Sequence, residues 1–300
     1  QNDNKVGFLY GFKSNKNNLI LGLESLYRSP LSAQQIDRIA DLSISTFGKT
    51  FITTEKEEIL SGPYKGTYEK GEKIPDPNCE SNGGILLGGF CKFAYGKRFN
   101  VINKERHHKA YLNLNTSVED SFLISNDFNL IYAKVNVQDN PQSPSYPALP
   151  FLSRNILPGE GSSPFENEIK WRGRPLGSNY PSPFSTKDIY QYHITDSMKF
   201  SFFENDFFDI SITHSAHSNL AIRPDIINSR FQEALAGKGG ERKNLSWNLF
   251  ADINADELVQ YVSGNLIAKK KGSLSSIDGI YLTNFNEIYF SAGFQIARDT

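Results

Sequence analysis

The chain has 300 residues, a net charge of -1 and lysines and arginines scattered along its length, so it lacks the basic stripe expected of a nucleic-acid-binding protein. Only 38% of its residues are hydrophobic and no run of about 18 apolar residues occurs, which excludes a transmembrane helix. A transmembrane β-strand needs only about 9–11 residues, every second of which can be polar, so the composition is compatible with a membrane β-barrel.

Hydropathy alternates with period two in eight segments, and such alternation predicts β-strands. In chain order the predicted strands cover residues 6–12, 19–23, 110–114, 131–137, 194–202, 208–212, 277–283 and 288–296. The aromatic content of 13% suits strands and interfacial girdles, although an ordinary β-rich core is equally compatible with it.

The connections between these segments alternate between short and long. Short links follow the first, third, fifth and seventh strands, whereas the long connections cover residues 29–106, 139–188 and 218–275. Outer-membrane barrels have short periplasmic turns and long extracellular loops, and loops beyond about 15 residues are uncommon in compact soluble domains. The pattern therefore predicts an all-β fold, an antiparallel transmembrane β-barrel of about eight strands, partial in extent, with long extracellular loops.

The two faces of such strands meet different surroundings. We expect the faces that carry Ile131, Val135, Phe290 and Phe294 to contact lipid. Side chains that suit a polar barrel interior include Lys134, Asp209 and Gln295.

The long connections carry few signals of regular structure. The proline density of residues 140–183 predicts that no central strand forms there. One helix is predicted over residues 255–263, with Asn254 as its cap and Asp256 and Glu257 in its first turn, where acidic side chains favour the helix dipole.

The two cysteines, Cys79 and Cys91, flank the glycine-rich segment 80–90. We predict a disulfide that closes this short loop, which implies an oxidising compartment. Two free thiols are the alternative. A metal site is not favoured, because two cysteines without CxxC spacing offer too few ligands.

Catalytic signatures are not found. The sequence contains no G-x-S-x-G, no H-E-x-x-H and no Walker lysine loop, so we expect neither an enzyme nor a cofactor. The adjacent His107 and His108 should point to opposite faces of a strand, and His214 and His217 should also diverge, so no metal site is predicted.

One stretch of the second long connection combines aromatic and cationic side chains. A guanidinium group can pair with a carboxylate, and an indole ring offers a stacking surface. The candidate ligand-binding residues of an external vestibule are Trp171, Arg172 and Arg174, with Tyr146 and Tyr180 nearby in sequence. The alternative is that these residues fold the loop on itself.

Several short motifs occur in a characteristic order. They are STFG at 45–48, PDPNC at 75–79 with the partner Cys91, FAY at 93–95, SPSYP at 143–147, WRGRPLG at 171–177, SWNLF at 246–250 and GFQIAR at 293–298. In order and spacing, over nearly the whole chain, they resemble the TonB-dependent receptor superfamily. The resemblance implies a 22-stranded barrel around an N-terminal plug, which TonB opens to admit a siderophore, cobalamin or carbohydrate ligand.

Neither a plug nor a TonB box is found in residues 1–300, and about eight strands are too few for that barrel. We therefore expect a fragment of the barrel domain, located in the outer membrane of a Gram-negative bacterium. Its expected partners are outer-membrane lipid, an extracellular small-molecule ligand and, through the missing plug, the TonB complex. No family binding residue carries over.

Three alternatives stay open. The first is a complete small barrel that acts as a pore or adhesin. The second is an enzyme on a barrel, which would need a nucleophile system at the rim. The third is a soluble β-rich binding protein, which would be extracted without detergent.

Overall fold

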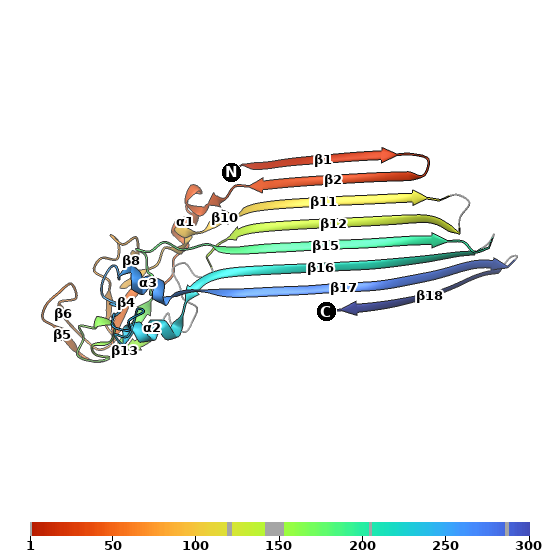
Figure 1. Ribbon diagram of the computed structural model, residues 1–300. Coiled ribbons are helices and arrows are strands. Elements are labelled where there is room, and N and C mark those ends of the chain that lie inside the picture. The colour runs from red at the N-terminus through yellow and green to blue at the C-terminus, as the bar shows by residue number, and fades with distance from the viewer. Residues whose placement is uncertain (1, 119–121, 142–152, 204–205, 286–287) are drawn as a thin grey trace.

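The computed structural model describes residues 2–118, 122–141, 153–203, 206–285 and 288–300. Two regions are distinct: a long open sheet and a lobe of short elements at one end of it (Figure 1). The large sheet is antiparallel throughout, and its strands lie side by side in chain order. Its strands are β1 (Asp3–Lys13), β2 (Asn17–Arg28), β11 (Lys104–Ser117), β12 (Leu123–Asp139), β15 (Ser185–Phe200), β16 (Asp206–Ile226), β17 (Ser263–Phe285) and β18 (Ile288–Asp299).

All eight predicted strands are present, and the antiparallel all-β fold is confirmed. The strands are longer than their alternating segments, because backbone pairing continues where the hydropathy pattern ends. β17, for example, starts 14 residues before the predicted segment and includes the lysines at 269–271.

The short links all lie at one end of the sheet and the three long connections at the other, as predicted (Figure 1). The sheet is open, with β1 and β18 as its edges, and every residue of both edge strands is exposed. Closure into a barrel is therefore not a property of this arrangement of eight strands.

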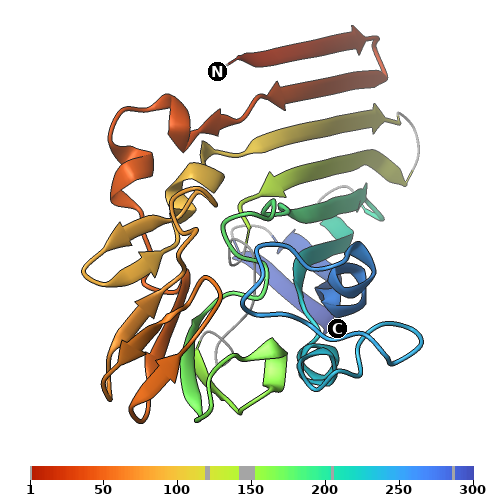
Figure 2. The same ribbon diagram turned by 90° about the vertical axis from the view of Figure 1, so that its left-hand side faces the viewer.

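The lobe is assembled from all three long connections, which Figure 2 shows gathered beyond the ends of the strands. Its main sheet has the order β13-β14-β4-β7, and β3 with β10, β5 with β6, and β8 with β9 form pairs. Its strands are β3 (Leu31–Ser32), β4 (Lys49–Thr53), β5 (Glu57–Ile59), β6 (Gly66–Tyr68), β7 (Lys73–Pro75), β8 (Ile85–Leu87), β9 (Phe90–Lys92), β10 (Asn100–Ile102), β13 (Ser153–Ile156) and β14 (Ile169–Gly173). Its helices are α1 (Ile39–Leu42), α2 (Asn228–Leu235), α3 (Asp256–Val262) and the 3-10 turns η1 (Ala33–Gln35), η2 (Tyr95–Arg98) and η3 (Glu160–Ser162).

The prediction that no central strand forms within 140–183 is wrong. β14 lies inside the small sheet, between β13 and β4, and all of its residues have sheet partners. Pro164 and Pro175 lie outside β14, so every residue of the strand keeps a backbone N–H for pairing. Pro164 and Pro175 therefore lie on either side of β14 and do not interrupt its pairing.

The principal hydrophobic core of the described residues lies in the lobe, not on the large sheet. Phe51, Trp171, Phe231 and Trp247 are each at most 1% exposed, and they come from all three connections. The Phe231 ring contacts those of Trp171 and Trp247, with centroids 6.2 and 5.6 Å apart. Burial of these rings binds the connections into one folded body.

The predicted disulfide between Cys79 and Cys91 is confirmed, and both cysteines are buried in the lobe. The loop between them contains β8, and Cys91 itself belongs to β9. Gly84 fits against the bond, because a Cβ atom there would lie 2.8 Å from the Cys79 Sγ atom.

Helix α3 forms where predicted, with Asp256 and Glu257 in its first turn. Asn254 does not cap it, since the N-cap is Ala255 and no side chain bonds the free N–H groups. The Asn254 side chain instead accepts from the backbone N–H of Asn248 at 2.7 Å and donates to its carbonyl oxygen at 2.9 Å. The amide therefore closes a loop rather than a helix.

Candidate functional site

The two faces of the large sheet differ in chemistry, as two adjacent rows of residues demonstrate. Residues paired across an antiparallel ladder share a face, and sequence neighbours take opposite faces. One row reads Phe12, Leu19, Leu114, Phe128, Asp196, Ile212, Ile277 and Ile296. The next row, on the opposite face, reads Lys13, Asn18, Asn115, Asp127, Ser197, Ser211, Asp278 and Gln295. We call the face of the first row the apolar face and that of the second the polar face.

Apolar side chains continue along the apolar face over several rows. They include Val6, Phe8, Tyr10, Leu21, Leu23, Leu112, Leu130, Ile194, Ile210, Phe290 and Phe294. Many are open to solvent in this structure; Val6 is 73% and Ile296 is 66% exposed. Carboxylates interrupt the face at three places: Asp196 accepts a hydrogen bond of 2.6 Å from the Asn126 amide, Asp206 at the turn end accepts one of 3.2 Å from the Tyr281 hydroxyl, and Asp188 lies towards the lobe.

The polar face is linked by side-chain hydrogen bonds between strands. Asn113 donates to Asp127 and to Asn129, each at 2.8 Å, across β11 and β12. Ser197 and Ser211 are 2.9 Å apart across β15 and β16, and Gln295 on β18 donates to Asp278 on β17. Such ladders satisfy polar groups on a surface that is wet or in contact with other polar groups.

The prediction that Ile131 and Val135 share the face of Phe290 and Phe294 is wrong. Ile131 pairs with Tyr111 and His193, on the polar face. Segment 128–137 is apolar at both odd and even positions, so only the pairing register assigns its faces. Lys134 likewise lies on the apolar face, beyond its apolar part, whereas Asp209 and Gln295 lie on the polar face as expected.

The apolar part of the face shifts along the strands from one edge of the sheet to the other. On β1 it runs from Val6 to Phe12, and on β18 from Ile288 to Ile296, centred on Ala292. The row of paired residues that starts at Phe8 ends at Thr300, next to β18, and the row that starts at Tyr10 ends at Arg298. Thr300 is eight residues and Arg298 six residues from Ala292, the centre of the apolar part on β18.

This shift amounts to about one residue for each of the seven strand-to-strand steps. With a rise of about 3.3 Å per residue and strands about 4.8 Å apart, the apolar band runs at about 35° from the perpendicular to the strands. A flat band around a barrel has that geometry when the strands tilt by about 35–45°, the range of outer-membrane barrels.

Aromatic side chains bound the apolar band at both limits. Towards the lobe lie Tyr132 and Tyr192, which are paired across β12 and β15. At the turn end the Phe200 ring stacks on those of Phe122 and Phe208, with centroids 5.7 and 6.5 Å apart. Tyr192 and Phe200 are eight residues apart on β15, about 26 Å along the strand and about 22 Å along the normal of a membrane crossed at that tilt. Aromatic girdles flank an apolar band about 25 Å tall in transmembrane barrels.

The predicted ligand-binding residues do not form an open site in the described part of the lobe. Trp171 is 1% exposed and packs against Phe231, so its ring offers no free stacking surface. The Arg172 guanidinium lies 4.9 Å from the ring centroid of Phe47 and 5.2 Å from that of Phe90. Tyr146 lies outside the described residues.

Arg174 and Tyr180 are also engaged within the lobe. Arg174 lies over the Phe93 ring at 4.8 Å and donates to the carbonyl oxygen of Phe47 at 2.7 Å. Burial, with the nearby charge of Arg98, lowers the pKa of Arg174 to about 10. The Tyr180 hydroxyl accepts from the backbone N–H of Asn254 at 2.7 Å. These contacts agree with the alternative in which the residues fold the loop on itself.

A small cavity lies among these side chains, lined by Trp171, Arg174, Tyr180, Trp247 and residues of the third long connection. Its volume of about 20 Å³ has room for one water molecule, whereas small-molecule sites typically measure about 300–1,000 Å³.

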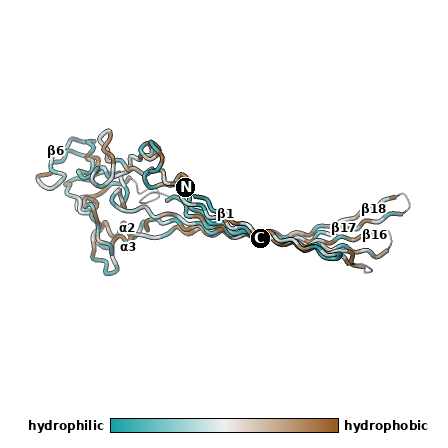
Figure 3. The backbone as a smooth tube through the Cα atoms, turned by 90° about the horizontal axis from the view of Figure 1, so that it is seen from above, coloured by the Kyte–Doolittle hydropathy of each residue, from teal (hydrophilic) through white to brown (hydrophobic). Residues whose placement is uncertain are grey.

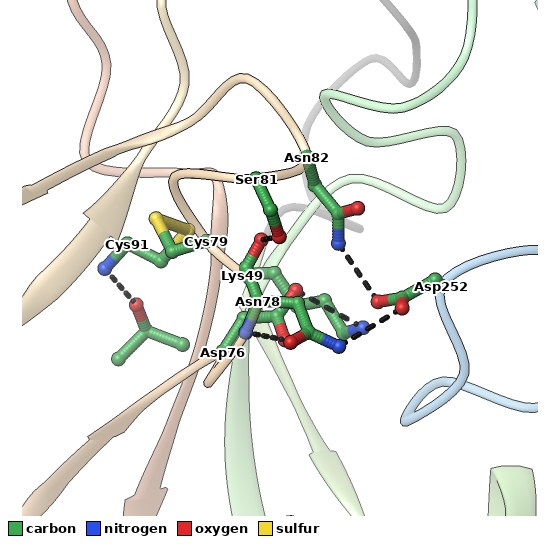
Figure 4. Close-up of a disulfide and its surroundings, with 9 residues drawn as sticks. Lys49, Asp76, Asn78, Cys79, Ser81, Asn82, Cys91 and Asp252 are labelled. Atoms are coloured by element: carbon green, nitrogen blue, oxygen red, sulfur yellow. Dashed lines mark hydrogen bonds and ion pairs between the residues drawn. A yellow bond between two sulfur atoms is a disulfide. The ribbon is translucent and has the colours of Figure 1, made fainter.

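Sequence reasoning missed the contact that joins the disulfide loop to the third connection (Figure 4). The Asp252 carboxylate accepts from the side-chain amides of Asn78 and Asn82, at 2.9 and 2.7 Å. Lys49 pairs with Asp76 at 3.2 Å and donates to the Ala251 carbonyl oxygen at 3.0 Å. These residues are about 170–200 positions apart in sequence, so no local pattern could have indicated the contact.

The histidine, cysteine and acidic side chains of the described residues are dispersed. No group of three or more His, Cys, Asp and Glu side chains there is placed to hold a metal ion. His107 and His108 take opposite faces as predicted, the first beside Glu105 and the second beside Ser25. Within the same ranges no helix has both the length and the apolar character needed to cross a membrane.

Comparison with known proteins yields no relative. No protein-family model matches the chain, and neither a curated protein nor a solved structure matches it.

Proposed function

We propose that the large sheet is a section of the wall of an outer-membrane β-barrel, in which the apolar face contacts lipid and the polar face lines the interior. The proposal rests on one observation. The apolar band has aromatic side chains at both of its limits, and the opposite face of the sheet carries a row of polar residues only. The hydropathy-coloured view shows both colours running along the sheet (Figure 3).

A membrane explains why so much apolar surface lies on a sheet without a covering layer. Monomeric soluble proteins rarely expose contiguous apolar patches beyond a few hundred Å². The apolar face extends across all eight strands, and the chain's buried aromatic core lies elsewhere, in the lobe. Lipid would remove this face from water as a core does in a soluble protein.

The open edges favour a barrel with more than these eight strands. Backbone groups in a bilayer need hydrogen-bond partners, so β1 and β18 must each pair with a strand in the membrane. Since the two edges lie at opposite ends of the sheet (Figure 1), further strands would complete the ring.

The resemblance to TonB-dependent receptors supports the finer proposal. In that account the chain is the plug-less barrel fragment of a receptor for a siderophore, cobalamin or carbohydrate ligand, and the lobe is an external cap. A polar interior wall and a folded lobe at the long-loop end suit such a receptor.

Fractionation of the producing cell tests the barrel wall, and a binding assay tests the receptor class. The native protein that contains this chain should be in the outer-membrane fraction, run with heat-modifiable gel mobility, and have an intact mass well above the 33.7 kDa of the chain. Purified in detergent, it should retain the purified TonB periplasmic domain. Outer-membrane location without TonB binding would overturn the receptor class, and extraction without detergent would overturn the barrel.

A further inference from the structure

Beyond the apolar band, at the end next to the lobe, the apolar face becomes cationic. Lys104 and Arg106 on β11 and Lys134 on β12 form one group, and Lys269 and Lys271 on β17 form a second. Register places all five on the apolar face: Arg106 pairs with Tyr27 and with Asn136, and Lys134 pairs with Tyr190. We call them the cationic belt.

The belt lacks carboxylate partners among the residues that the structure describes. None of its five cations forms an ion pair there, and the acid at the same level, Asp188, accepts a hydrogen bond from Asn136. Several cations on the polar face do form ion pairs, among them Lys5 and Lys109 with Glu24 and Lys187 with Asp139. Because its cations have no carboxylate partner among the described residues, the belt keeps its positive charge for an external group.

Aromatic and hydroxyl groups lie between the cations. Lys134 Nζ is 5.2 Å from the Tyr190 ring centroid, and Arg106 Cζ is 5.7 Å from that of Tyr27. A hollow of about 440 Å³ opens beside Tyr190, Ser218 and Lys271. Strands β12 and β17 are three strand steps apart in the sheet, a distance of about 14 Å. An extended polar group could therefore contact both groups of cations at once.

We propose that the cationic belt binds the phosphorylated headgroup of a lipid in the leaflet next to the lobe. The proposal rests on the proposed membrane wall. The belt continues the proposed lipid-contacting face beyond its apolar band on the side of the lobe, where the headgroups of that leaflet lie, and basic residues there attract anionic lipid. Lysine stems can extend along the apolar surface while their ammonium groups reach phosphate oxygens.

The test uses the native protein and the two faces of one strand. Lys269 and Lys271 belong to the belt, whereas Lys270 lies between them on the polar face and is also exposed. The double variant Lys269→Gln/Lys271→Gln is compared with Lys270→Gln. Each protein is incorporated into nanodiscs of zwitterionic lipid with a small fraction of bisphosphorylated lipid A or of the same lipid dephosphorylated, and bound lipid A is counted by native mass spectrometry.

We expect the double variant to bind phosphorylated lipid A on the order of 25-fold more weakly, about 5-fold for each cation, and Lys270→Gln to match the wild type. Equal binding of the dephosphorylated lipid, or an equal loss in Lys270→Gln, would overturn the headgroup site. Displacement of the lipid by inorganic phosphate alone would instead assign a free-phosphate site. Failure of the wild type to enter nanodiscs would contradict the membrane wall itself, which separates the two proposals.

Discussion

Leu112 and Asn113 are neighbours in β11 and lie on opposite faces of the sheet. Leu112 pairs with Leu21 and Leu130 in the apolar band, and Asn113 pairs with Ile20 and Asn129 on the polar face, where its amide bonds Asp127 at 2.8 Å. Because both occupy the same level along the strand, they form a matched pair for testing what each face contacts.

Arginine at these two positions should have unequal effects. Leu112→Arg places a cation near the middle of the apolar band, on the face proposed to contact lipid, and should cost about 2–4 kcal/mol of folding free energy. Asn113→Arg places the cation on the polar face and should cost much less. Reversible unfolding of the native protein in lipid vesicles, followed by tryptophan fluorescence, measures both, and equal costs would argue against lipid on the apolar face.

The disulfide should stabilise the lobe. A bond that closes a loop of 12 residues is worth about 3 kcal/mol in the loop-entropy account. Trypsin leaves both cysteines in peptide 74–92, so a glutamate-specific protease that cleaves after Glu80 is added; without reductant Cys79 and Cys91 should then occur in one linked product that separates on reduction. The Cys79→Ser/Cys91→Ser variant should be digested faster within residues 44–100; an unchanged map after reduction would show that the bond is absent.

Truncation in the lobe core should loosen the lobe and leave the sheet intact. Trp171→Ala removes an indole that is 1% exposed and should cost about 3–5 kcal/mol locally. Leu86→Ala, at a side chain 50% exposed, is the control and should cost little. Hydrogen exchange of the native protein should increase at β4, β14 and α2 for Trp171→Ala alone. Slow exchange at these elements in that variant would mean that the indole does not hold the connections together.

Alkaline pH should weaken the lobe through Tyr64. Burial raises the pKa of Tyr64 far above its ordinary value of about 10, so the folded lobe keeps a proton that the unfolded chain loses. The stability from this group is complete below pH 10 and is lost as pH rises from there towards the folded pKa.

Between about pH 11 and pH 12, where the unfolded tyrosine is almost fully ionised, the wild type should lose about 1.4 kcal/mol per pH unit more than Tyr64→Phe. The lowered pKa of Arg174 acts in the opposite direction, since the unfolded chain then binds more protons, but it is common to both proteins and cancels. Hydrogen exchange or proteolysis of the lobe across this range measures the difference; parallel pH profiles would contradict the buried, neutral Tyr64.

The strands and their order could be predicted because period-two alternation and connection length are local signals. Residues 288–296 alternate clearly, and β18 forms there with its apolar residues on one face. Around Ile131 the signal failed, because Leu130 and Ile131 are both apolar and only pairing with β11 and β15 separates them.

The lobe was beyond sequence reasoning for a different physical reason. Its core joins Phe51, Trp171 and Trp247, which are far apart in the chain and have no shared periodicity. A tryptophan beside two arginines in a proline-rich loop has the same composition whether it binds a ligand or fills a core. Only the burial of Trp171 and the engagement of Arg174 with Phe93 distinguish the two.

The most direct test of the membrane wall is spin labelling of Leu112→Cys and Asn113→Cys in the native protein reconstituted in vesicles; Cys79 and Cys91 are bonded and do not react. The account predicts that the label at 112 is relaxed by oxygen and shielded from a water-soluble nickel complex, while the label at 113 has the reverse preference. Equal access of the nickel complex to both labels would contradict a lipid-facing apolar face.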